Sequence, residues 1–169
     1  MQTWDAIASR RNVRSFADRP VSAEHLDRIL EAGRRAPSSR NTQPWDFVLV
    51  TDRAQLEELA TVWVGAGHVA TSAATIAMVV SADAGQARRT QFDLGQAAMS
   101  IMLAAADLGV GSCHAGIGDQ GLADRLLGLP EDRSCAFLIS LGYPADRPLA
   151  PIARPDRRPF DQVVHLGVW

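Results

Sequence analysis

Residues 36–45 of the chain have the sequence Ala36-Pro37-Ser38-Ser39-Arg40-Asn41-Thr42-Gln43-Pro44-Trp45. Each proline fixes its own φ at about −65° and biases the residue before it toward extended geometry. A connector needs only a turn, whereas this loop is stiff at both ends and rich in hydroxyl, guanidinium and carboxamide groups. Such a loop is suited to binding a flat polar ligand. The alternative is a surface loop whose Ser and Asn side chains cap nearby backbone.

Helices and strands are predicted on both sides of this loop from hydrophobic periodicity. Ser22 is expected to cap the helix that precedes the loop, and the basic pair Arg34–Arg35 closes that helix. A short helix begins after Thr3, and others are predicted at about 52–63, 89–108 and 120–127. Buried strands are predicted at 47–51, 73–82 and 134–141, with a turn at 83–86. Helix 89–108 is apolar nearly all round, which predicts a core element.

Composition indicates one globular domain over residues 1–169, with 47% hydrophobic and 21% charged residues. Seventeen basic and nineteen acidic residues give a net charge of −2, which argues against nucleic acid as a partner. The two cysteines and four histidines show no metal-ligand spacing, so no metal site is predicted. Both thiols are expected to be buried in a reducing compartment. With no secretion signal and no membrane span, we expect a soluble, cytoplasmic protein.

Residues 116–121 spell GxGxxG, which is a signature of dinucleotide-binding loops. That signature requires a firm strand before it and an acidic residue at the end of a second strand about 20 residues later. Here the preceding strand is short at best, and Asp119 would direct a carboxylate at the pyrophosphate. Asp119 is better explained as the N-cap of helix 120–127, so a dinucleotide site is not expected at this position.

Three arginines fall within five residues of the N-terminal segment, at Arg10, Arg11 and Arg14. Guanidinium groups bind phosphate through paired hydrogen bonds, so this cluster is a candidate phosphate site. The alternative is an exposed basic turn. A related possibility is an anion- or RNA-binding module that also uses the arginines of 147–158, and the negative net charge argues against it.

The C-terminal part of the chain divides into an extended linker and an apolar end. Residues 147–159 contain four prolines and four arginines, and the residues after them are mostly apolar up to Trp169. A free tail of this kind would aggregate, so it must dock on its own core or on another subunit. This is the sequence argument for an oligomer.

With these elements in view, the chain resembles the FMN-dependent nitroreductase family over nearly its whole length. Four blocks carry the resemblance in the family's order. They are residues 9–14, similar to the family's Arg-Arg-Ser-x-Arg opening; residues 36–45, the most specific block; residues 93–95 with 108–116; and residues 141–144 with 157–160 and Trp169.

The resemblance implies an α+β fold: a three-layer α/β/α sandwich with a mixed central sheet, assembled as an intertwined homodimer with FMN at the interface. The tail at about 147–169 is then expected to pack on the partner subunit. The phosphate and ribityl chain would be held by Arg10, Arg11, Asn12 and Arg157. The pyrimidine edge of the flavin would lie by Arg14. The other subunit would contribute Pro37, Ser38, Ser39 and Asn41, and the backbone at Ala115 and Gly116 would pass near N5 and O4.

The expected activity is an NAD(P)H-driven ping-pong reduction of nitroaromatics, quinones or similar electron-poor small molecules. No acid–base or nucleophile constellation is visible, and none is required because the flavin carries the hydride chemistry. The protein's part is positive charge near N1 and O2, which suits Arg14 as charge stabiliser. Two alternatives are a flavin-dependent dehydrogenase or oxidase that passes electrons to oxygen, and a non-catalytic flavin-binding protein.

Two departures from the family pattern bear on the pocket. His114 stands where an aromatic residue is common, either as a packing residue or as a proton donor to the acceptor. The span from about Trp63 to Asp93 is short, whereas larger relatives place helices there that roof the flavin. A shortened roof predicts an open, permissive site.

Overall fold

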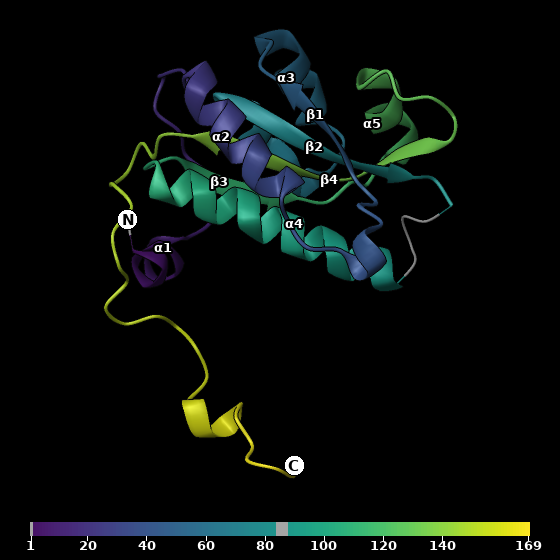
Figure 1. Cartoon of the computed structure of the whole chain (residues 1–169). Coiled ribbons are helices and arrows are strands. Elements are labelled where there is room, and N and C mark those ends of the chain that lie inside the picture. Colours follow the sequence, from purple (N-terminus) through teal and green to yellow (C-terminus); the bar gives the residue numbers. More distant parts are fainter. Residues whose placement is uncertain (1, 84–87) are drawn as a thin grey trace.

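A four-stranded antiparallel sheet with the strand order β1-β2-β4-β3 forms the middle layer of the molecule (Figure 1). The computed structural model describes residues 2–83 and 88–169. The strands are β1 (Asp46–Val50), β2 (Ala74–Ser81), β3 (Gly111–Ala115) and β4 (Arg133–Gly142). The parallel component of the sheet is an isolated bridge between Asn12 and Ser112, so the N-terminal segment runs beside edge strand β3.

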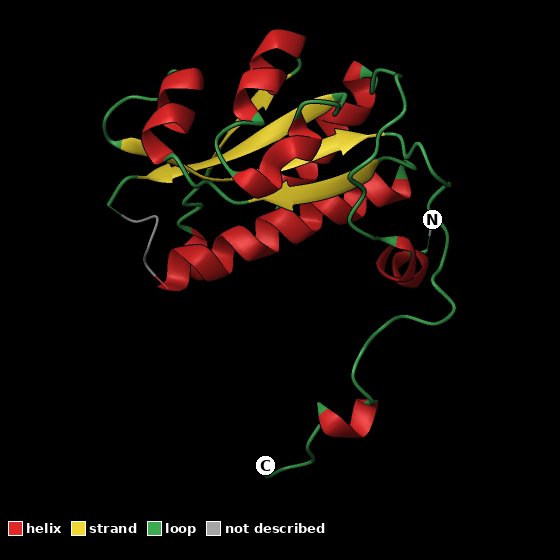
Figure 2. Ribbon diagram, turned by 180° about the vertical axis from the view of Figure 1, so that it is seen from behind, coloured by secondary structure: helices red, strands yellow, loops and turns green. Residues whose placement is uncertain are grey.

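Helices cover both faces of the sheet, which gives the expected three layers (Figure 2). The α-helices are α1 (Thr3–Ser9), α2 (Ala23–Arg34), α3 (Arg53–Leu59), α4 (Arg88–Asp107) and α5 (Gln120–Leu126). Short 3₁₀ segments are η1 (Ser39–Asn41), η2 (Val64–Val69) and η3 (Phe160–Gln162). In the described part of the chain, no helix combines the length and apolar character that crossing a membrane requires.

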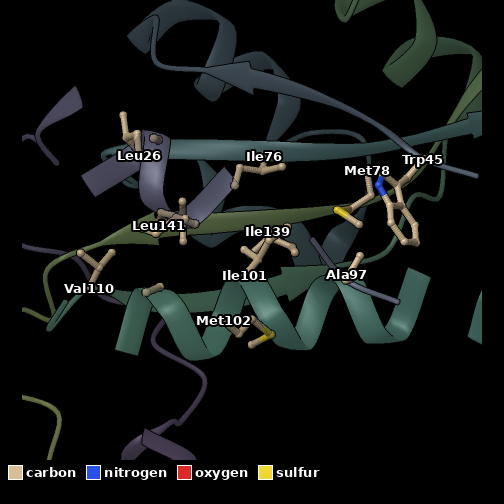
Figure 3. Packing of buried hydrophobic residues seen from close by; sticks show 14 of the residues in the cluster. Leu26, Trp45, Ile76, Met78, Ala97, Ile101, Met102, Val110, Ile139 and Leu141 are labelled. Atoms are coloured by element: carbon tan, nitrogen blue, oxygen red, sulfur yellow. The ribbon is translucent and has the colours of Figure 1, made fainter. Parts of the chain in front are cut away.

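The two faces of the sheet bury separate hydrophobic cores. On one face, Ile101 and Ala97 of α4 pack toward Ile139 of β4 and Met78 of β2 (Figure 3). On the other face, a second cluster joins the sheet to α3, η2 and α5. Strand β2 is buried along nearly its whole length because it lies between β1 and β4 with helices on both sides. This confirms the sequence prediction of a strand buried on both faces.

Local signals located the helix starts. Side-chain oxygens of Ser22, Asp52 and Asp119 accept hydrogen bonds from backbone N–H groups three residues later, as N-caps do. The end of α3 was predicted too late, at about Trp63. The helix stops at Leu59 because the N–H groups of Thr61 and Val62 bond to carbonyls three residues back instead of four, and Trp63 is extended. The predicted turn at 83–86 falls mostly on residues outside the described ranges.

Helix α4 differs from the core helix that its composition predicted. One face packs in the core, but the opposite face carries an apolar stripe in this single chain, with Phe92 68% and Met99 45% exposed. The C-terminal tail likewise leaves the body of the molecule (Figures 1 and 2), and Trp169 is fully exposed. The sequence predicted that the tail docks either on its own core or on another subunit. In the single chain the tail does not dock on its own core.

Helices α2 and α4 approach each other closely at Gly33. A Cβ at this position would lie 2.8 Å from both Cγ1 and Cδ1 of the fully buried Ile101, and 3.2 Å from Cζ of Phe47. We expect Gly33→Ala to lower the free energy of unfolding by about 1–2 kcal/mol, because overpacking in a core outweighs the gain in helix propensity. Urea titration followed by circular dichroism measures the change.

The matched control is Gly67→Ala in η2, where an added Cβ meets nothing within 4 Å. This variant should stay within about 0.5 kcal/mol of the parent. Equal stability of both variants would show that the helix packing at Gly33 is not tight.

Candidate functional site

The N-terminal segment after α1 carries the predicted phosphate-binding residues along the edge of the sheet. The Val13 N–H donates to the Ser112 carbonyl at 3.0 Å, and the Val13 side chain packs where Gly111 has no Cβ. Side chains alternate along an extended segment, so Arg10, Asn12 and Arg14 share one side while Val13 is buried on the other. The interleaved pattern noted in the sequence is therefore a strand-like segment with a buried side and a polar side.

Arg10 and Asn12 line a hollow of about 330 Å³ between this segment and α4. The Arg10 guanidinium donates to Asn12 Oδ1 at 3.4 Å. The exposed His114 of β3 lines the same hollow, together with Met99 and Met102 of α4. A guanidinium and a carboxamide thus converge beside an apolar wall, which is an arrangement for a ligand with both a charged and a flat apolar part.

Arg14 is exposed beyond this hollow, and its guanidinium makes no hydrogen bond or ion pair within residues 2–83 and 88–169. Its positive charge acts on its surroundings, since it lowers the pKa of His68 and opposes the burial that raises the pKa of the Cys113 thiol. Arg14 is thus an uncompensated cation near the end of the sheet.

Arg11 faces away from the other two arginines. Its Nη2 atom lies 2.6 Å from Asp146 Oδ1 and donates to the Arg147 carbonyl at 3.0 Å. The hydrogen bond from Arg11 lowers the pKa of Asp146. The single chain therefore places Arg11 at the start of the C-terminal tail, apart from Arg10 and Asn12.

Arg157 is also apart from this cluster. It lies in the exposed tail, and its guanidinium donates to the carbonyl of its neighbour Asp156 at 2.6 Å. The tail extends from the body (Figure 2), and Arg157 is not among the residues that line the hollow of its own chain.

The proline-bounded loop is held in a strained conformation. Arg40, Asn41 and Gln43 have φ of 55°, 57° and 48°, and they are all the non-glycine residues with positive φ in the described chain. Backbone of this kind costs about 1–3 kcal/mol per residue and persists where the surroundings enforce it. The loop is thus pre-organised, as the sequence predicted for a ligand-binding segment.

Asp93 of α4 is a residue that holds this loop, and the sequence reasoning gave it no role. Its carboxylate is 1% exposed, and both of its oxygens lie 3.1 Å from the Ser39 backbone nitrogen, which donates to them. Ser38 Oγ accepts from the Gln43 N–H at 2.9 Å, and the Pro37 carbonyl accepts from Gln96 at 3.3 Å. The available sequence signal was Asp93 among mostly apolar residues near the start of the helix.

The loop and the arginine segment lie along the same side of α4 but in different hollows. Pro37, Ser38 and Ser39 line a depression of about 750 Å³ over the first turns of α4, near Phe92. Asn41 is exposed at the end of the loop. A third depression, lined by Pro37 and Met99 among others, lies between the two. In one chain, the predicted site residues therefore lie in separate hollows rather than in one closed pocket.

Ala115 is the last residue of strand β3, and Gly116 follows it. The Ala115 side chain belongs to the core on the α3 and α5 side, so only its backbone is available to a ligand. Gly116 opens the GxGxxG stretch. The structure confirms the capping role of Asp119, which accepts from the Leu122 N–H at 2.9 Å, and β3 is an antiparallel edge strand without the parallel crossover that a dinucleotide site needs.

A buried histidine lies under the same end of the sheet. His68 Nδ1 lies 2.7 Å from Ser140 Oγ, and the Ser140 hydroxyl donates to the Cys113 carbonyl at 3.1 Å. Because that hydroxyl has one proton, Ser140 accepts from Nδ1–H, which leaves the buried Nε2 unprotonated and without a hydrogen-bond partner in the described chain. Burial, Arg14 and His114 lower the pKa of His68.

Both cysteines are free and buried, as predicted. Burial raises the pKa of the Cys135 thiol to about 12 and raises the pKa of Cys113. Thiolate chemistry at neutral pH is therefore disfavoured at both positions. Within the described ranges, no three His, Cys, Asp or Glu residues are grouped as ligands of a metal ion.

His68 should make stability depend on pH. Its folded pKa lies below the ordinary value of 6.5, so the unfolded chain binds more protons between the two values. Stability is then fully present above about pH 6.5 and is lost as the pH falls toward the folded pKa. We expect the melting temperature to fall less between about pH 7.5 and pH 5.5 in His68→Asn, whose amide can still donate to Ser140, than in the parent.

His165→Asn is the control for this measurement, because His165 is exposed in the tail. It should keep the pH slope of the parent in differential scanning calorimetry. An unchanged slope in His68→Asn would mean that His68 does not resist protonation in the folded protein.

Comparison with known proteins identifies the family of this chain. The model of the Nitroreductase family matches residues 7–71 and 62–143. A protein of Methanothermobacter thermautotrophicus, named provisionally as an NADH dehydrogenase/NAD(P)H nitroreductase, is 33% identical over 100% of this chain and 88% of its own.

Solved structures are similar over nearly the whole chain. An FMN-dependent nitroreductase of Clostridium difficile superposes with a TM-score of 0.84 at 27% identity, covering 96% of this chain and 99% of that one. The NADPH:FMN oxidoreductase of Vibrio harveyi, solved with NAD⁺, gives a TM-score of 0.81 at 28% identity, covering 97% of this chain and 76% of that one.

Proposed function

The chain belongs to the nitroreductase family, and we propose that it is an FMN-dependent oxidoreductase that uses NADH or NADPH to reduce electron-poor small molecules such as nitroaromatics and quinones. When bound, FMN accepts a hydride from the nicotinamide and delivers electrons to the acceptor. The observation that carries the proposal is the polar side of residues 10–14, which run beside β3. There, Arg10 and Asn12 line one hollow, and the uncompensated Arg14 follows them on the same extended segment.

The residues present fit this cofactor. We assign Arg10 and Asn12 to the phosphate and ribityl chain, because a guanidinium and a carboxamide converge on one hollow. Arg14 supplies positive charge to the pyrimidine side, where reduction adds negative charge. The backbone at Ala115 and Gly116 borders the ring. Arg11 keeps its predicted phosphate role only if a bound phosphate displaces Asp146 from its guanidinium.

The remaining groups are proposed to come from a second copy of the chain. The exposed stripe of α4 (Phe92, Gly95 and Met99) is an apolar surface that a partner would cover. The 36–45 loop contacts the start of α4, and the arginine hollow lies one to two turns further on. A two-fold contact across the stripe would therefore bring Pro37, Ser38, Ser39 and Asn41 of the partner subunit toward Arg10 and Asn12.

The tail is proposed to complete this assembly. Residues 1–169 would form one FMN-binding domain whose tail, about 147–169, packs on the partner. Phe160, Leu166 and Trp169 are 77%, 92% and 100% exposed in the single chain, and a partner surface would remove them from water. Arg157 would then reach the phosphate of the neighbouring site.

The first test is the colour and reduction of the purified protein. We expect FMN to remain bound after gel filtration, with flavin absorption that NADH or NADPH bleaches without oxygen and that p-benzoquinone restores. Arg14→Ala should keep FMN but lower its midpoint potential by about 20–60 mV, equivalent to about 1–3 kcal/mol for two electrons, and should slow the bleaching.

Each part of this test has an outcome against the proposal. Bound FMN that neither nicotinamide bleaches would indicate a non-catalytic flavin-binding protein. Rapid reoxidation by oxygen with no response to quinone would favour the oxidase alternative. An Arg14→Ala variant with unchanged potential and rate would remove Arg14 from its assigned role.

The second test concerns the partner. Met99→Asp places a charge in the middle of the exposed stripe, where burial against a second copy would be costly. We expect sedimentation to show a dimer for the parent and a monomer for Met99→Asp, with the FMN content of the variant falling at least about tenfold. Leu49→Asp is the control, because Leu49 is partly exposed on β1 at the opposite edge of the sheet from β3.

Leu49→Asp should remain dimeric and flavin-bound. A Met99→Asp dimer that retains its FMN would contradict the assigned interface. A monomeric Met99→Asp with full FMN content would instead contradict a site shared between subunits.

A further inference from the structure

Trp63 is an aromatic side chain whose exposure the fold does not explain. It lies where α3 gives way to η2, and it keeps 42% of its surface exposed although its ring packs close to Gly65 and Gly118. The next residue, Val64, is 96% exposed. Large apolar side chains this accessible usually either scatter singly over the surface or mark a binding site. The surroundings of Trp63 distinguish these two possibilities.

The indole ring is fixed against the turn that follows β3. A Cβ on Gly118 would lie 3.0 Å from Trp63 Cδ1, and a Cβ on Gly116 would lie 3.9 Å from Trp63 Cε3. A Cβ on Gly65 would collide with the six-membered part of the ring. Two close positions without side chains, Gly65 and Gly118, therefore define where the ring lies. This fixed position of an exposed aromatic ring favours a binding role for Trp63.

The backbone fixes the same corner. The N–H groups of Gly118 and Asp119 both donate to the Val62 carbonyl, at 3.0 Å and 2.8 Å. Residue 62 is thereby tied to the turn that follows β3, and its neighbour Trp63 is brought to Gly116. A ring that is already fixed suits a stacking contact, because the Trp63 side chain loses little conformational freedom when the ligand binds.

This corner also adjoins the positive charge of the proposed flavin site. His68, in the same 3₁₀ segment that follows Trp63, has its pKa lowered by Arg14 and His114 as well as by burial. Trp63 thus lies between Gly116 and η2, whose His68 has its pKa lowered by the charge of Arg14.

We propose that Trp63 is the aromatic wall of the acceptor pocket and determines its preference for flat aromatic acceptors of the nitroaromatic and quinone class. The inference rests on the proposed function, since it takes the backbone at Gly116 as the border of the flavin ring. The short connection between α3 and β2 makes one side chain, rather than an added helix, the contact for the acceptor. Trp63 positions the acceptor by stacking and takes no part in proton or hydride transfer.

The test measures binding as well as turnover. Benzoate is a non-reducible isostere of nitrobenzene, and its binding to FMN-loaded protein can be followed through the change that it causes in flavin absorption. We expect Trp63→Ala to raise the Kd of benzoate and the KM of nitrobenzene about three- to tenfold, the size that one aromatic pair contributes. Trp63→Phe keeps a flat ring and should stay within about twofold of the parent.

Two further variants make the test specific. Gly65→Ala should displace the ring without removing it and should weaken benzoate binding to a similar extent. Val64→Ala shortens the exposed neighbour and should leave benzoate binding unchanged. Ferricyanide, an inorganic acceptor without a ring, should keep its KM in all four variants.

Contrary outcomes are distinguishable. An unchanged Kd of benzoate in Trp63→Ala, with normal FMN content, would overturn the role of Trp63 and leave the proposed function standing. A loss of FMN from Trp63→Ala would mean that the ring holds the cofactor instead, and an equal rise in the KM of ferricyanide would mean a general disturbance. A parent protein that binds no FMN would overturn the proposed function itself.

Discussion

The pairing of the N-terminal segment with strand β3 is the interaction on which the rest of this molecule depends. The hydrogen bond from Val13 to Ser112 and the seat of Val13 over Gly111 hold residues 10–14 extended along an edge that would otherwise be open. An extended backbone forces alternate side chains to opposite sides. Burying Val13 therefore obliges Arg10, Asn12 and Arg14 to face outward together. A hydrophobic contact of modest size thus sets the position of the polar groups.

The second half of the site obeys a different constraint. Three residues with left-handed backbone in the 36–45 loop carry a cost that a free loop would relax, and the buried carboxylate of Asp93 holds the Ser39 N–H against that relaxation. A buried carboxylate is costly unless it is hydrogen-bonded, so the loop and Asp93 stabilise each other. Both halves are formed before any ligand arrives. They remain separate because they lie over different turns of α4.

The sequence predicted the parts of this structure that local chemistry decides. Capping by Ser22, Asp52 and Asp119 follows from a side chain and a backbone group three residues apart, and it is present in all three cases. The stiff loop followed from its two prolines. Contacts between distant segments were not predictable in this way: the pairing of Arg11 with Asp146 and of His68 with Ser140 joins residues 135 and 72 positions apart. The exposed stripe of α4 was missed because apolar composition alone does not say whether a helix is covered by its own chain or by another.

The surfaces that a single chain leaves uncovered are the surfaces that the proposed site uses. An isolated chain without a ligand would leave several groups exposed to water with no role. They are Phe92 and Met99 on α4, the apolar tail, the free guanidinium of Arg14 and the ring of Trp63. Two kinds of partner account for them. A second copy would cover the apolar stripe and the tail, while a flavin and a flat acceptor would cover Arg14 and Trp63. The short connection between α3 and β2 would leave one side chain, Trp63, at the border of the pocket. Such a pocket selects acceptors for a planar ring more strongly than for their size and shape.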